Sequence, residues 1–155
     1  MKRIAAFLVI AAALSCGDDL VFAPELDIDL SEFRKTETGL YIKDVATGAG
    51  DEAALGDTVF VDYKAWYVNA ALLDESGDNP FRFVLGSGDV IPGFDEGVRG
   101  MRPGGSRRLV IPPELAYGYS DIRIGGEWIP GGSWLVYDVT LVELRQAQEP
   151  ASTDP

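Results

Sequence analysis

The sequence contains no histidine and a single cysteine, Cys16. Without histidine the chain cannot assemble a Ser-His-Asp or Cys-His catalytic group, and histidine metal sites are excluded. A lone cysteine rules out an internal disulfide and a zinc–thiolate cluster. We therefore expect no metal and no cofactor, and a chemistry that relies on carboxylates, hydroxyls, backbone amides and apolar surface.

Basic residues are also scarce. The sequence has 13 Lys and Arg and 25 Asp and Glu, which gives a formal net charge of −12. Such an acidic surface repels phosphate backbones and anionic lipid. This excludes nucleic acid as a partner, and it excludes membrane attachment through a basic patch. Solubility is the simplest interpretation of the acidity. The 18 glycines and 9 prolines among 155 residues favour many turns and few long helices.

The first 15 residues have the pattern of a signal peptide. Lys2 and Arg3 precede an apolar run over residues 4–14, which is too short to cross a bilayer core of about 30 Å as a helix. Cys16 follows a small residue at the end of this run, an arrangement that resembles a bacterial lipobox. We expect cleavage before Cys16 and a lipid on its thiol. Ordinary cleavage nearby, with Cys16 incidental, is the alternative.

Acidic and polar segments flank the centre of the chain. Residues 16–37 are interpreted as the lipidated cysteine and an acidic tether, whose flexible reach would be about 25 Å. Residues 146–155 have the composition of a disordered tail. Gly17 follows the cysteine in place of an aspartate that would favour the inner membrane. The expected location is therefore the periplasmic side of the outer membrane. One domain of ordinary size remains, over residues 38–145.

Within this domain short strand patterns alternate with turn clusters. Alternation of apolar and polar residues predicts strands over residues 40–45, 58–68, 81–85, 107–111 and 134–144. The inward face of the second strand would carry Val59, Val61, Tyr63 and Ala65, and that of the last Leu135, Tyr137, Val139 and Leu141.

Only residues 93–101 have the spacing of a helix. This stretch follows Pro92 and has acidic residues in its first turn, and it places Phe94, Val98 and Met101 on the face toward the sheet. We expect an α+β fold in which a twisted antiparallel sheet wraps around one short helix.

Six motifs in order make residues 39–144 resemble the FKBP domain of peptidyl-prolyl cis-trans isomerases. They are VDY at 61–63 with Asp74 after it, NPFRFVLG at 79–86, VIPGFDEGV at 90–98, GGSRRLVI at 104–111, PELAYG at 113–118, and IP at 129–130 with LVYDV at 135–139. The resemblance implies an enzyme that rotates prolyl bonds in proline-containing segments of exported proteins, and a monomer.

The resemblance also assigns a site. Phe94 would form the floor of an apolar pocket, the Ile91 N–H and the Tyr117 hydroxyl would donate to substrate carbonyls, and Asp74 would orient Tyr63. The remaining positions carried over as substrate-binding are Leu73, Phe81, Val90, Trp128, Ile129 and Tyr137.

Three of these positions depart from the family. Leu73 and Tyr137 stand where phenylalanine is usual, and Phe94 stands where tryptophan is. We expect slower turnover and weakened binding of macrolide ligands. Prolyl rotation needs an apolar pocket and hydrogen-bond donors, but no nucleophile or metal. A module of the same fold that binds proline-containing segments with little turnover is the alternative function. A carboxylate-pair hydrolase has poor support, because no motif places two acids in a cleft.

Overall fold

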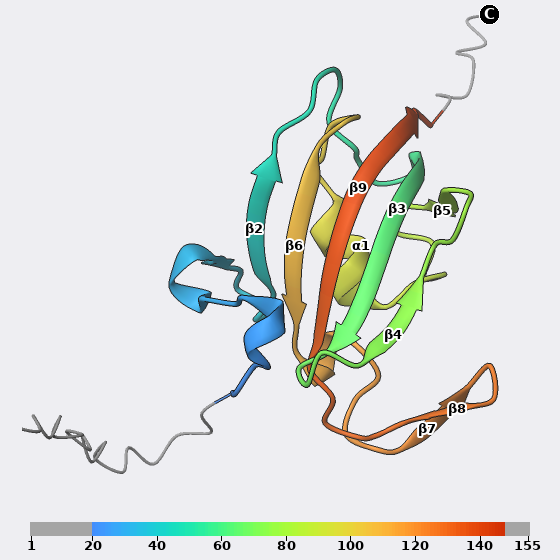
Figure 1. Cartoon of the computed structure of the whole chain (residues 1–155). Coiled ribbons are helices and arrows are strands. Elements are labelled where there is room, and N and C mark those ends of the chain that lie inside the picture. The colour runs from blue at the N-terminus through green and yellow to red at the C-terminus, as the bar shows by residue number, and fades with distance from the viewer. Residues whose placement is uncertain (1–19, 148–155) are drawn as a thin grey trace, which may run out of the picture.

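A seven-stranded antiparallel sheet wraps around one short helix in this computed structural model, which describes residues 20–147 (Figure 1). The strand order is β1-β2-β6-β9-β3-β4, and β5 pairs with the first half of β3. The strands are β1 (Arg34–Lys35), β2 (Tyr41–Ala46), β3 (Thr58–Tyr67), β4 (Leu72–Glu75), β5 (Phe81–Val84), β6 (Ser106–Ile111) and β9 (Leu135–Arg145). The other elements are helix α1 (Pro92–Val98), the hairpin β7 (Ile122–Ile124) and β8 (Glu127–Ile129), and 3₁₀ turns at Pro24–Leu26, Leu30–Glu32 and Pro113–Leu115.

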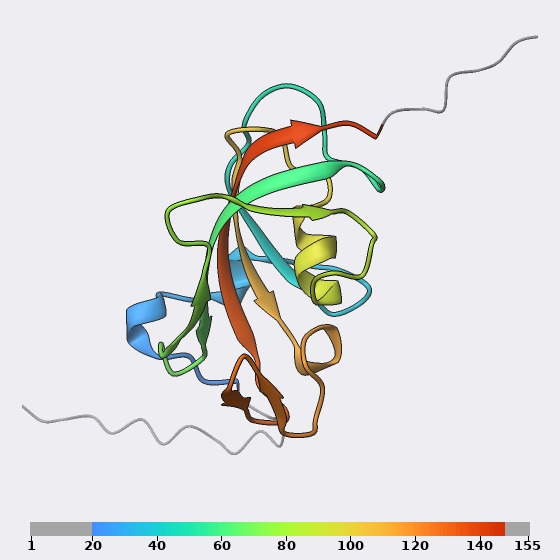
Figure 2. The same ribbon diagram turned by 90° about the vertical axis from the view of Figure 1, so that its right-hand side faces the viewer.

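This architecture confirms the predicted α+β class. All five predicted strands and the helix are present, with ends that differ by at most three residues. The sequence did not predict the short strands β1, β4, β7 and β8. The view turned by 90° shows how strongly the long strands curve around α1 (Figure 2).

The hydrophobic core lies between α1 and the face of the sheet that curves around it. Val59, Val61 and Ala65 of β3 are buried there, as their alternation predicts. Phe94 and Val98 of α1 pack against the same cluster. The helix therefore presents its apolar side to the concave face of the sheet, and its first turn packs against that face.

Two glycines let α1 approach β6 closely. A Cβ on Gly97 would lie 2.8 Å from Leu109 Cδ2, closer than van der Waals contact allows. A Cβ on Gly93 would overlap the Ile111 side chain of β6 and lie 3.2 Å from the Leu115 carbonyl oxygen. Side chains at these two positions would push the helix off the sheet, so the glycines fix the depth at which Phe94 enters the core.

The N-terminal segment, defined here as residues 20–37, packs on the opposite face of the sheet. It buries Leu26 and Phe33 against Val110 and Val136, which point away from α1. The segment thus helps to cover a second apolar face of the sheet, to which Trp66 and Trp134 also contribute. The expectation of a flexible tether up to residue 37 is therefore wrong for this stretch of the chain.

Hydrogen bonds fix the segment in place. The Ala23 N–H donates to the Val68 carbonyl at 2.7 Å, and the Arg108 guanidinium donates to the Leu26 carbonyl at 2.8 Å. Strand β1 adds an edge to the sheet by pairing with β2. The free energy gained from apolar burial and these hydrogen bonds outweighs the conformational entropy that the segment loses when it packs on the sheet.

The expected signal peptide (residues 1–15) and Cys16 lie outside the described residues, as does the chain beyond Ala147. Gln146 and Ala147, expected at the start of a disordered tail, donate hydrogen bonds to Asp51 and Asp57. No helix within residues 20–147 is long and apolar enough to span a membrane.

Candidate functional site

A pocket of about 480 Å³ opens at the concave end of the sheet, beside the first turn of α1 and the β7–β8 hairpin. We call it the aromatic pocket. Eight residues assigned to the site from the sequence line it: Tyr63, Asp74, Phe81, Val90, Ile91, Phe94, Tyr117 and Tyr137. The volume suits a proline ring with the peptide groups on either side of it.

Four aromatic rings form the interior of the pocket. The Phe94 ring centroid lies 5.0 Å from that of Tyr137 and 5.4 Å from that of Tyr63. Phe81 meets Tyr63 edge to face, with centroids 5.8 Å apart. These separations fall in the range where aromatic pairs attract one another beyond simple burial. The rings therefore hold one another in fixed positions around Phe94, which lies at the bottom of the pocket.

The polar side of the pocket is a tyrosine–carboxylate pair. The Tyr63 hydroxyl donates to Asp74 Oδ2 at 2.7 Å, and Asp74 Oδ1 accepts the Glu75 N–H at 2.9 Å. An irregularity in the pairing of β3 with β4, between Ala65 and Trp66, helps to aim Asp74 toward the ring. Burial raises the pKa of the Tyr63 phenol well above its ordinary value, and the bond to Asp74 raises it further.

Two further hydroxyls and one amide face the same space. Burial raises the pKa of Tyr117, with the charge of Asp74 adding to the effect. Burial, and then the neighbouring Tyr117 and Tyr63, raise the pKa of Tyr137. All three tyrosines therefore stay protonated, as hydrogen-bond donors, through neutral and mildly alkaline pH. The Ile91 N–H has no acceptor among the described residues, so it is available to a bound carbonyl.

A buried carboxylate positions the first turn of α1. Asp95 is almost fully buried, and its two oxygens accept the Gly86 N–H at 2.6 Å and the Arg99 Nε–H at 2.8 Å. The Ile91 carbonyl in turn accepts the Phe94 N–H at 3.1 Å. The turn after β5 and the start of the helix are thus joined, which keeps Ile91 and Phe94 at the mouth and floor of the pocket.

Three residues assigned to substrate binding from the sequence do not line the pocket. Leu73 packs against the main core from β4, behind Asp74. Ile129 is buried opposite Ile122 in the hairpin, and Trp128 is 65% exposed on the hairpin's outer side. Leucine at position 73 therefore alters the support of the pocket rather than its lining.

The structure adds Ile124 to the pocket, a residue that the sequence reasoning missed. Ile124 pairs with Glu127 and lies next to the tight turn of the hairpin, at Gly125 and Gly126. Successive residues of a strand point to opposite sides, so a hairpin that turns Ile124 toward the pocket directs Trp128 away from it. The Gly-Gly pair between two alternating stretches, residues 122–124 and 127–129, was the available signal for this hairpin.

Comparisons with known proteins agree with this geometry. The family model of the FKBP-type peptidyl-prolyl cis-trans isomerases matches residues 50–142. Over 110 residues the chain is 40% identical to the FK506-binding protein of Neisseria meningitidis serogroup B, covering 70% of this chain and 98% of that one. Over 112 residues it is 44% identical to FK506-binding protein 4 of Mycosarcoma maydis, covering 72% of this chain but only 29% of the longer fungal protein.

Solved structures show the same relationship. FkpA from Escherichia coli superposes with a TM-score of 0.68 at 36% identity, over 80% of this chain and 56% of that one. AtFKBP13 superposes with a TM-score of 0.65 at 35% identity, over 72% of this chain and 98% of that one. With a family model covering more than half of its length, this chain belongs to the FKBP-type peptidyl-prolyl cis-trans isomerase family.

Proposed function

We propose that the chain catalyses cis–trans rotation of prolyl bonds in exported proteins at a bacterial cell envelope, as a monomer anchored by a lipid on Cys16. The observation that carries the catalytic part is the aromatic pocket, in which an apolar floor at Phe94 lies below the Tyr63–Asp74 pair and the unpaired Ile91 N–H. No metal or nucleophile enters this chemistry.

The pocket lowers the rotation barrier in two ways. Water stabilises the planar, conjugated amide more than the twisted one, so a dry aromatic surface favours the twisted state. Donors such as the Ile91 N–H and the Tyr117 hydroxyl hold the neighbouring carbonyls while the bond turns. A ten-thousandfold acceleration requires about 5.5 kcal/mol of preference for the transition state, against a barrier of about 18–20 kcal/mol. The same apolar surface fits macrolide ligands, with affinity weakened by the leucine at position 73.

The catalytic proposal predicts the effect of removing the carboxylate. Asp74→Ala should lower kcat/KM for prolyl peptides in a protease-coupled assay by about tenfold to a hundredfold, because a hydrogen bond to a charged group contributes about 1.5–3 kcal/mol. Asp62→Ala is the matched control, since Asp62 precedes Tyr63 on β3 but is exposed and does not line the pocket. Equal losses in the two variants would argue against a specific role for Asp74.

Measuring peptide binding alongside turnover distinguishes the isomerase from the alternative function. A binding module of this fold would hold proline-containing peptides without accelerating their isomerisation. The leucine behind Asp74 is the feature that favours it, because a less rigid support weakens the grip on the twisted amide. Saturable peptide binding by a wild-type protein that shows no turnover would replace the isomerase proposal with this one.

The anchor is tested by Cys16→Ser in the full-length gene. The variant should leave the membrane fraction and the detergent phase for the soluble fraction, because the lipid is attached through the thiol. The prolyl turnover of the released protein should be unchanged, since the aromatic pocket lies in the folded domain. A variant that partitions like the wild type would show that Cys16 carries no anchor.

A further inference from the structure

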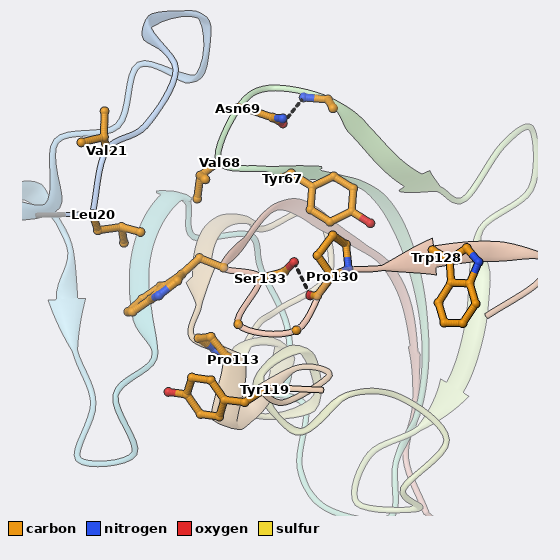
Figure 3. Close-up of a pocket in the computed structure, with 14 residues that line it drawn as sticks. Leu20, Val21, Tyr67, Val68, Asn69, Pro113, Tyr119, Trp128, Pro130 and Ser133 are labelled. Atoms are coloured by element: carbon orange, nitrogen blue, oxygen red, sulfur yellow. Dashed lines mark hydrogen bonds between the residues drawn. The ribbon is translucent and has the colours of Figure 1, made fainter. Parts of the chain in front are cut away.

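A second groove, of about 850 Å³, lies outside the aromatic pocket at the end of the molecule where the described chain begins. We call it the hairpin groove. Figure 3 shows Leu20 and Val21 along one side and Trp128 on the other, with Tyr119 and Pro130 between them. Ser133 donates to the Pro130 carbonyl at 2.6 Å, which helps to fix the loop that forms its base.

The lining of the groove is uncharged. None of its 14 lining residues is Asp, Glu, Lys or Arg, although a quarter of the whole chain is charged. Its rim carries three of the most exposed large apolar side chains of the described residues: Val21 is 75% exposed, Tyr119 70% and Trp128 65%. The groove itself thus presents apolar surface without charge, and the carboxylates beside it are engaged, Glu114 with the Tyr119 hydroxyl and Asp121 with the Gly131 N–H.

The distance from the proposed anchor restricts which end of the protein faces the membrane. Because the N-terminal segment packs on the sheet, only four Cα–Cα steps separate Cys16 from Leu20, the first described residue. Four steps span at most about 14 Å in any conformation. The fully flexible tether expected from the sequence would have allowed any orientation, whereas this short connection holds the hairpin groove close to the lipid headgroups.

We propose that the hairpin groove and its rim rest on the lipid surface of the membrane to which Cys16 anchors the chain. The inference rests on the proposed anchor and goes beyond it. Trp128 and Tyr119 are residue types that settle at the headgroup level, with an apolar ring and a polar tip. The C-terminal end of β9 lies at the far end of the molecule, away from the membrane (Figures 1 and 2).

The test uses the full lipidated chain reconstituted in vesicles of phosphatidylethanolamine and phosphatidylglycerol. The lipid blocks the Cys16 thiol, so an introduced cysteine is the single site for an environment-sensitive fluorophore. Trp128→Cys and Tyr119→Cys place the probe on the groove rim. Val45→Cys is the matched control, because Val45 is 66% exposed near the end of β2, away from the groove.

We expect blue-shifted emission, quenched by brominated acyl chains, from the probes at positions 119 and 128, and water-like emission from the probe at 45. Insertion of about 20 Gly and Ser residues between Asp19 and Leu20 should reduce the shift, because a longer connection lowers the local concentration of lipid at the groove. Thermal melting of each labelled variant verifies that the domain is folded.

The remaining outcomes are separable. If the protein floats with the vesicles but all three probes report water, the lipid contact is wrong while the anchor stands. If the protein does not float at all, the anchor fails and the lipid contact falls with it. If the groove probes respond to a permanently unfolded apolar polypeptide and not to lipid, the groove binds clients, and the proposal is overturned in favour of that use.

Discussion

Replacing Phe94 with alanine is expected to abolish prolyl turnover and to lower the free energy of unfolding by about 3–5 kcal/mol. The ring is 3% exposed and packs on Tyr63 and Tyr137, so its loss leaves a cavity in the core. The same cavity admits water to the floor of the aromatic pocket, where the twisted amide would lie. Chemical denaturation measures the stability, and the protease-coupled peptide assay measures the turnover.

Phe83 provides the control for this experiment. Its ring is 2% exposed and lies 5.6 Å from that of Phe94, but it does not line the pocket. Phe83→Ala should cost a similar amount of stability and retain most of the turnover of the folded protein. Phe94→Leu keeps much of the core volume and should fold while losing turnover. Wild-type rates in a folded Phe94 variant would show that the reaction occurs elsewhere.

Removing the N-terminal segment is expected to have the second large effect. A protein that begins at residue 38 should be less stable than one spanning residues 20–147 by at least about 3 kcal/mol. Leu26 and Phe33 are both buried by the segment, and each buried apolar side chain contributes about 1.5–3 kcal/mol. The truncation also exposes Val110 and Val136, so the shorter protein should aggregate more readily on heating.

Point variants locate the effect within the segment. Leu26→Ala in the 20–147 protein should reproduce part of the loss, while Glu37→Ala, at an exposed position of the same segment, should change the melting temperature little. The aromatic pocket lies on the other face of the sheet, so turnover of the folded fraction should persist. Equal melting temperatures for the two fragments would mean that the segment does not stabilise the sheet.

The sequence predicted the sheet and helix well where alternation was regular. In β3 the inward residues Val59, Val61 and Ala65 follow the period of a half-buried strand, and their burial is as expected. The packed N-terminal segment was missed because its apolar residues follow neither the helix nor the strand period. A signal was present elsewhere, since residues 109–111 and 135–137 are continuous apolar runs, which indicates strands covered on both faces.

The candidate site was likewise predicted in part, with the pocket residues expected and the hairpin missed. Motif order brought the residues of the aromatic pocket together, because Tyr63, Phe81, Phe94 and Tyr137 lie on elements whose spacing a family fixes. The hairpin was not predicted, because its two strands are only three residues long and the positions of Trp128 and Ile129 were taken from the family resemblance alone. Trp128, which was assigned to substrate binding, is exposed outside the pocket, and Ile124 lines it instead.

The place of β9 in the sheet determines when the domain can fold. This strand ends at Arg145, near the end of the described chain, yet it lies between β6 and β3 and pairs with both along its length. A chain synthesised from its amino terminus cannot complete its sheet until this last strand is available. Folding then proceeds through pairings distant in sequence, such as Thr58 with Arg145, which are slow to form.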